Sequence, residues 1–108
     1  MRRALAILLL AAAGALAVRA CAGPQPSVTA SWLEPRPGGY VAVAAVRNAG
    51  GDGEVQVSFR LRDRATGRTV PVQGTAQVRR GEEVQVRAYV PAPPGDWRLE
   101  AESEYPPR

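Results

Sequence analysis

The sequence predicts an all-β protein: a small antiparallel immunoglobulin-like β-sandwich of about seven strands, preceded by an N-terminal signal or anchor helix. Short runs alternate apolar and polar residues, and clusters of Gly, Pro, Asn and Asp separate them. No window after residue 22 has a helical period. The chain of 108 residues is long enough for one small domain of this kind.

Residues 1–22 are predicted to direct export rather than to fold with the domain. Two arginines precede an uninterrupted apolar run, Ala4 to Val18, whose length suits a secretory signal and is short for a membrane span of about 20 residues. Three fates remain open: cleavage after Ala22, retention as a membrane tether through residues 4–18, and lipidation on Cys21. Each of them makes the domain exported: periplasmic, secreted or membrane-anchored outside the cytoplasm.

The mature chain is predicted to divide into a linker with a first strand at 23–38, a sandwich core at 39–105 and a tail at 106–108. In the first strand Val28, Ala30 and Trp32 share one phase of the alternation, which predicts that the tryptophan is buried. The segment 40–47 is the most continuously apolar. Its composition predicts a central strand that is covered on both sides, or whose small alanines let another layer approach closely.

The glycine-rich segment 48–53 is predicted to be a turn, because a phosphate cradle would need a following helix and a strand follows instead. That strand, 54–63, has a period of two. Its inward set is Val55, Val57, Phe59 and Leu61, and its outward set is Gln56, Ser58, Arg60 and Arg62.

The remaining strands follow from the same two signals. Residues 68–73 are predicted to form an edge strand because Pro71 has no backbone N–H to donate, and residues 75–78 are predicted to form a separate short strand. Residues 83–90 alternate with valines and an alanine inward. The last strand, within 96–105, has Trp97, Leu99 and Ala101 inward.

Three motifs, VRNAG, FRLRD and RRGEEVQV, resemble the FxLYD-type and CARDB-like immunoglobulin-like domains of bacteria. Phe59, Leu61 and Asp63 match the Phe-x-Leu-x-Asp pattern of these domains, and Arg62 stands in place of its tyrosine. The later pair Gly81 and Glu82 matches the Gly-Glu pair that opens another strand. The resemblance covers residues 40–102. It implies an exported adhesive, scaffold or accessory domain without catalysis.

Composition excludes several chemistries. The chain has no histidine, so a Ser-His-Asp or Cys-His arrangement is impossible, and a single cysteine permits no internal disulfide. We therefore expect no enzyme activity, no cofactor and no metal. Oxygen ligands for calcium could be sought at Asp52, Glu54 and Asp63, but turn residues that cap their own backbone are the favoured interpretation.

Net charge argues against nucleic acid as a partner. Removal of residues 1–22 takes away three of the 14 basic residues and none of the 10 acidic ones, which leaves a net charge of +1.

The preferred function is an exported, non-catalytic accessory or protein–protein interaction module of the bacterial cell envelope, with an envelope or membrane protein as its partner. The contact could use an edge strand near Thr69–Gln73, the exposed turns, or the candidate tyrosines Tyr40, Tyr89 and Tyr105. A simple spacer within a membrane complex is a further possibility.

The alternative function is a binder of anionic glycan or lipid headgroups through an arginine-rich sheet face. Its candidate residues are Arg60, Arg62, Arg79, Arg80 and Arg87. An acidic stripe on the last strand, Glu100, Glu102 and Glu104, offers these arginines cross-strand partners. That pairing favours an ordinary solvated sheet face.

Overall fold

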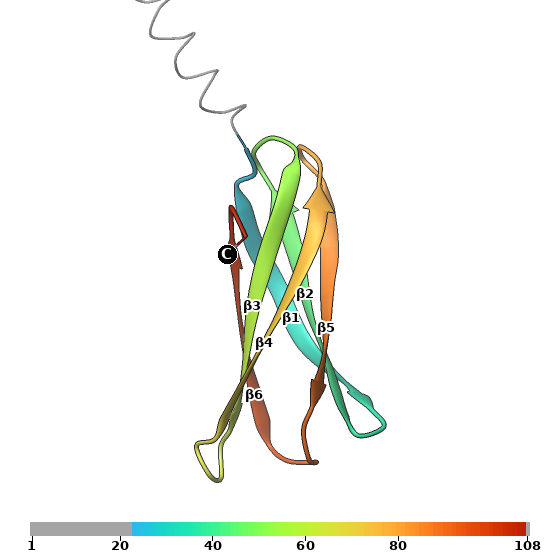
Figure 1. Ribbon diagram of the computed structural model, residues 1–108, viewed down its shortest axis with the longest axis vertical. Helices are drawn as coiled ribbons and strands as arrows, with labels where there is room; N and C mark the ends of the chain where they lie inside the picture. The colour runs from blue at the N-terminus through green and yellow to red at the C-terminus, as the bar shows by residue number, and fades with distance from the viewer. Residues whose placement is uncertain (1–22, 108) are drawn as a thin grey trace, which may run out of the picture.

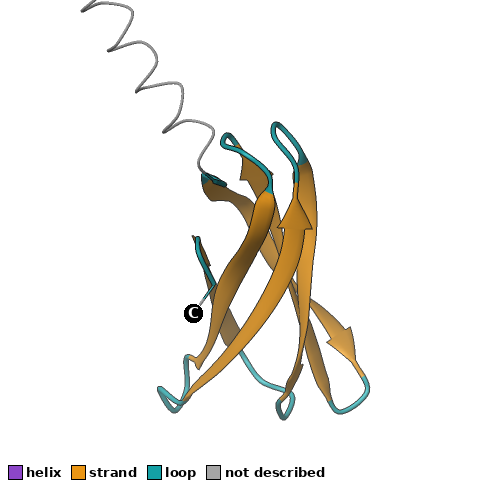
Figure 2. Cartoon of the chain, turned by 45° about the horizontal axis from the view of Figure 1, so that its top comes forward, coloured by secondary structure: helices purple, strands orange, loops and turns teal. Residues whose placement is uncertain are grey.

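The computed structural model describes residues 23–107, which form one sandwich of two three-stranded antiparallel sheets (Figures 1 and 2). The strands are β1 (Pro26–Arg36), β2 (Gly39–Asn48), β3 (Gly53–Asp63), β4 (Thr69–Val78), β5 (Glu83–Pro91) and β6 (Trp97–Glu104). Strand order is β1-β2-β5 in one sheet and β4-β3-β6 in the other. The predicted signal or anchor helix and Cys21 lie outside the described residues. Within residues 23–107 no helix is long and apolar enough to cross a membrane.

The sandwich has six strands where the sequence predicted about seven. The segments 68–73 and 75–78, predicted as two strands, form the single strand β4, which continues through Gly74. A methyl group at Gly74 would lie 2.7 Å from Cγ1 of Val86 on β5. Glycine is therefore needed there because β4 and β5 approach closely, and it does not mark a break in the strand.

The core lies between the two central strands, β2 and β3, as their patterns predicted. All four inward residues predicted on β3 are buried, the most exposed being Phe59 at 1%. Ala42 and Ala44 of β2 face the same core, while Val43 points to the opposite face and is also fully buried. β2 is therefore the central strand of its sheet, as predicted, with Ala42 and Ala44 toward the other sheet. Its outer side is only partly buried, because Val41 and Ala45 are half-exposed. Strand order also places β4, with Pro71, at a sheet edge.

The first strand corrects one prediction, because Trp32 does not face the core. Val28 pairs with Val46 and Ala30 pairs with Ala45, so Thr29 is an extra residue on β1, a β-bulge. The bulge reverses the alternation that follows it. Leu33 consequently packs against the core, and Trp32 lies half-buried on the outer face of its sheet, opposite Val43.

The described chain begins and ends at the same end of the sandwich, next to the β2–β3 and β4–β5 turns (Figure 1). Residues 23–25 are fixed there: Gly51 N donates to the carbonyl of Gly23 at 2.8 Å, and Ala49 N donates to that of Gln25 at 3.1 Å. The ring of Tyr105 lies against Gly23. The opposite end, which we call the far end, carries the β1–β2 and β3–β4 turns and the β5–β6 loop.

Candidate functional site

A network of polar side chains gathers around Glu34 on the outer face of the β1-β2-β5 sheet. Its Oε1 accepts hydrogen bonds from Arg87 Nη1 at 2.8 Å and Arg36 Nη2 at 2.9 Å, and its Oε2 accepts one from Trp32 Nε1 at 3.1 Å. Arg87 also donates to Gln85 at 3.2 Å. We call this set, Trp32, Glu34, Arg36, Gln85 and Arg87, the Glu34 cluster.

The Glu34 carboxylate is held in its charged form. The hydrogen bond from Arg87, together with that from Trp32, lowers the pKa of Glu34 below its ordinary value of 4.5, against the opposing effect of desolvation. A carboxylate in this setting is a poor general acid at neutral pH. Its role is to fix the tryptophan ring and two guanidinium groups in place.

The Glu34 cluster lies over an apolar floor and beside an exposed aromatic residue. Val43 is opposite both Trp32 and Arg87 in the ladders and is completely buried, so the network covers it. Tyr89, two residues beyond Arg87, is 51% exposed and donates its hydroxyl to the carbonyl of Pro37 at 3.2 Å. This face therefore combines a pre-ordered tryptophan and arginine with an accessible tyrosine.

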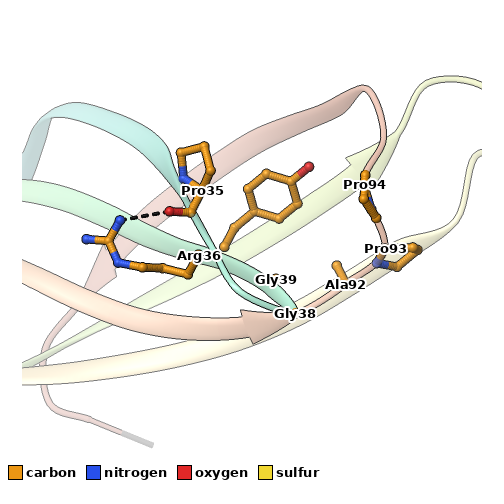
Figure 3. A pocket seen from close by; sticks show the side chains of 8 residues that line it. Pro35, Arg36, Gly38, Gly39, Ala92, Pro93 and Pro94 are labelled. Carbon is orange, nitrogen blue, oxygen red and sulfur yellow. Dashed lines mark hydrogen bonds between the residues drawn. The ribbon is translucent and has the colours of Figure 1, made fainter.

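A cavity of about 360 Å³ adjoins this cluster at the far end (Figure 3). Pro35 and Arg36 of β1 line one side, and Ala92, Pro93 and Pro94 of the β5–β6 loop line the other. The remaining lining residues are Gly38, Gly39 and Tyr40. The Arg36 guanidinium donates to the carbonyl of Pro35 at 2.8 Å. The walls of the cavity are mainly apolar, because prolines, glycines, Ala92 and Tyr40 form the rest of the lining.

The five arginines of the predicted anionic-ligand face do not form one surface. Arg60 and Arg62 lie on β3, on the outer face of the β4-β3-β6 sheet, whereas Arg87 lies on the outer face of the other sheet. Arg79 and Arg80 are in the β4–β5 turn, near the end where the described chain begins. Sequence reasoning missed this because it cannot assign two half-buried strands to opposite sheets.

Register places the predicted charge stripes on neighbouring strands. Arg60 is opposite Glu100, but Arg62 is opposite Arg98, and Glu102 is opposite Ser58. The alternation of the last strand puts Arg98 in the same phase as its glutamates. The sequence therefore contained the signal for this second arginine, which the prediction overlooked.

The oxygen ligands considered for calcium do not come together. Asp52 and Glu54 flank the start of β3 and Asp63 ends it, which separates them by about 30 Å at roughly 3.3 Å per residue. Asp63 Oδ1 accepts from Ala65 N at 2.9 Å, and Asp52 Oδ1 accepts from Arg80 N at 2.9 Å. Both carboxylates thus cap backbone N–H groups, and residues 23–107 hold no group of three metal-ligating side chains.

The tyrosines and the edge strand occupy different settings. Tyr40 packs against the core and accepts a hydrogen bond from Gly95 N at 3.4 Å, while Tyr105 is 44% exposed beside the first described residues. The β4 edge contains Pro71, and a proline in an edge strand turns its nitrogen toward the free side. A docking strand would need an N–H at that position. The sheet face that carries the Glu34 cluster and Tyr89 is therefore the better candidate for protein contact.

The fold and these surfaces define a small all-β sandwich of six antiparallel strands in two sheets. A similar solved structure is the 1.81 Å crystal structure of a DUF1425 family member from Shewanella sp. pv-4. It is 19% identical to this chain, with a TM-score of 0.59, and the match covers 77% of this chain and 80% of that one. At this identity the likeness shows the fold alone. No protein-family model and no curated protein matches the chain, so the FxLYD and CARDB resemblance stays a prediction.

Proposed function

We propose that this protein is an exported, non-catalytic interaction module of the bacterial cell envelope, which contacts an envelope or membrane protein through the Glu34 face. The Glu34 face comprises the Glu34 cluster and the neighbouring Tyr89. The single observation that carries the proposal is that a bulge at Thr29 turns Trp32 outward, where it shares the Glu34 carboxylate with Arg87 on the face that also carries Tyr89. Tryptophan, tyrosine and arginine are the residue types that concentrate binding energy at protein interfaces.

The hydrogen bonds of the Glu34 cluster favour this role. A partner would meet side chains that are already ordered, so less conformational entropy is lost when the complex forms. Val41 and Ala45 lie on the same face and are half-buried, which adds an apolar surface between the polar groups. A protein partner that presents apolar side chains fits this combination.

A non-catalytic role has independent support from the chemistry of the chain. The absence of histidine removes the commonest general base, and the carboxylate of the Glu34 cluster is held ionised by three donors. Strand order supports an immunoglobulin-like assignment, since strands one, two and five share a sheet while three and six share the other. In this chain β4 lies beside β3.

Site-specific photo-cross-linking in cells tests the proposal. A photoreactive phenylalanine analogue replaces Tyr89 in the tagged full-length chain, and a matched control places it at Gln73, which is exposed on the opposite sheet. We expect one reproducible protein adduct from position 89 that is absent from position 73. The adduct should also disappear when Arg87→Ala is added, with the melting temperature still showing a folded domain.

Two results would contradict the proposed contact. The first is an exported, folded protein that yields no adduct at position 89, and the second is the same set of adducts at both positions. Mass spectrometry of the purified N-terminus, in the same experiment, decides between cleavage after Ala22, a retained segment and lipidation on Cys21.

A further inference from the structure

Two arginines face each other directly on the outer surface of the β4-β3-β6 sheet, at its far end. Arg62 of β3 is paired with Arg98 of β6 and, on its other side, with Thr69 of β4. All three residues are exposed. Side chains that are directly opposite in an antiparallel ladder have Cβ atoms about 4.5–5.5 Å apart, and like charges at that spacing repel. A folded protein that retains such a pair accepts an electrostatic cost.

The protein itself does not neutralise these guanidinium groups. Among residues 23–107, no carboxylate oxygen lies within 4.0 Å of a side-chain nitrogen of Arg60, Arg62 or Arg98. Two acidic groups near this end have other contacts, since Asp63 caps the β3–β4 turn and Asp96 is 3.9 Å from Nε of Arg64. Glu100 is opposite Arg60 rather than opposite Arg62 or Arg98. The positive charge is therefore available to an external anion.

Charge is segregated along this face rather than evenly mixed. Arg62 and Arg98 occupy the far end, Arg60 and Glu100 come next on this face of the ladder, and the glutamates Glu102 and Glu104 lie opposite Ser58 and Gln56 toward the other end. Arg68, in the adjoining β3–β4 turn, adds a further positive charge, whereas Arg64 is paired with Asp96. Because guanidinium groups match carboxylate and phosphate in a bidentate geometry, this end is suited to anions of that kind.

A polar groove continues from the arginine pair toward the middle of the sheet. It has a volume of about 510 Å³, and it begins at Arg60 and Glu100, the ladder pair next but one to Arg62 and Arg98. Its other polar lining residues are Ser58, Gln73 and Glu102, and Phe59, Pro71, Val72 and Ala101 complete it. Hydroxyl, amide and carboxylate groups of this kind can hydrogen-bond to the hydroxyl groups of a sugar. The groove thus adds recognition of an uncharged polar portion to recognition of the anion.

We propose that the far end of this sheet binds an acidic glycan, with its phosphate or carboxylate group held by Arg62 and Arg98 and its sugar hydroxyls in the adjoining groove. The position favours a glycan over the headgroups of the membrane into which residues 4–18 could insert. Arg62 lies near the end of β3, about 30 Å from the end at which the described chain begins. This inference does not depend on the protein contact proposed for the Glu34 face, since the two surfaces lie on opposite sheets.

Isothermal titration of the purified full-length protein tests the site with defined probes. These are polygalacturonate oligosaccharides, phosphorylated starch oligosaccharides, neutral dextran and vesicles of phosphatidylglycerol. We expect the two acidic glycans to bind at 50 mM NaCl and the dextran and vesicles not to bind. Arg62→Gln and Arg98→Gln should each weaken glycan binding about tenfold, the loss of one charge-assisted contact.

The matched control is Arg79→Gln, which removes the same charge from an exposed turn outside the site. It should leave the affinity within about twofold of the wild type, as should Tyr89→Ala on the opposite sheet. A second readout is thermal: without ligand, Arg98→Gln should melt at or above the wild-type temperature because it relieves the repulsion with Arg62.

Three results would overturn the inference: no binding of either acidic glycan, an equal loss of affinity in Arg79→Gln, or binding of the vesicles alone. A failure here would leave the cross-linking result at Tyr89 unaffected. The two proposals can therefore be rejected separately.

Discussion

Replacement of Asn48 by alanine should strongly destabilise the domain, because this one side chain joins three chain segments. Its amide is fully buried and uses all four of its hydrogen-bonding positions. Oδ1 accepts from Gln25 N and Gly50 N, both at 3.0 Å. Nδ2 donates to the carbonyls of Gly51 at 2.8 Å and Arg79 at 3.0 Å. The amide thus connects the start of β1 to the β2–β3 and β4–β5 turns.

The size of the effect follows from which of these groups can turn to water. Gln25 and Arg79 are exposed, so their backbone groups can find solvent when the amide is gone. Gly50 N–H and Gly51 C=O belong to buried residues, and each unpaired buried group costs about 1–3 kcal/mol. We therefore expect a loss of about 2–6 kcal/mol, a large share of the ~5–15 kcal/mol that stabilises a typical domain.

Urea unfolding, followed by tryptophan fluorescence, measures this loss. The isosteric variant Asn48→Asp keeps the acceptor oxygens, loses both donors and places a negative charge beside two carbonyl oxygens, so it should be at least as unstable at neutral pH. Gln73→Ala, at an exposed position of β4, is the matched control and should stay within about 0.5 kcal/mol of the wild type. If Asn48→Ala also stays within that range, the argument from buried hydrogen bonds is wrong.

Three further predictions concern the core, a close backbone contact and the Glu34 cluster. Phe59→Ala, at 1% exposure, should cost about 3–5 kcal/mol in urea unfolding, and an unchanged midpoint would contradict the assigned strand register. Gly39→Ala would place a methyl group against the carbonyl oxygen of Val90 and should accelerate hydrogen exchange where β2 meets β5. Unaltered exchange rates there would show that the backbones can separate at no cost. Because the pKa of Glu34 is lowered on folding, its charge stabilises the fold above pH 4.5, and this contribution disappears as the pH falls through the lowered value. Glu34→Gln should therefore melt below the wild type at neutral pH and converge with it in acid, whereas a pH-independent difference would exclude the ionised contact with Arg87 as the cause.

The alternating strands could be predicted because their signal is local. In β3 and β5, successive apolar residues fall every second position, and a half-buried strand with this pattern needs no knowledge of its partners. Pro71 likewise predicted a sheet edge, because its missing N–H is a property of the residue itself. Gly74 misled the strand count, since the same residue type marks both turns and close approaches between strands.

The candidate sites required the tertiary structure. An unbroken alternation from Val28 predicts that Trp32 faces inward, and only the pairing with β2 reveals the extra residue at Thr29. The Glu34 cluster draws its donors from β1 and β5, and Arg87 is 53 positions beyond Glu34 in the chain. No pattern within either segment indicates that the two strands flank β2 in one sheet.

The sequence by itself determined that the domain after residue 22 is all-β, that the chain has no internal disulfide and no histidine chemistry, and which side of most strands is apolar. These properties depend on residue type and on spacing over a few positions. The tertiary structure decided which strands share a sheet, and hence that Arg60 and Arg62 lie on a different face from Arg87, and that Arg62 meets Arg98. The physical reason is that a β-strand presents the same alternation to any neighbour. Its partners, its register and the direction of its outer face are fixed only when the two sheets close over a common core.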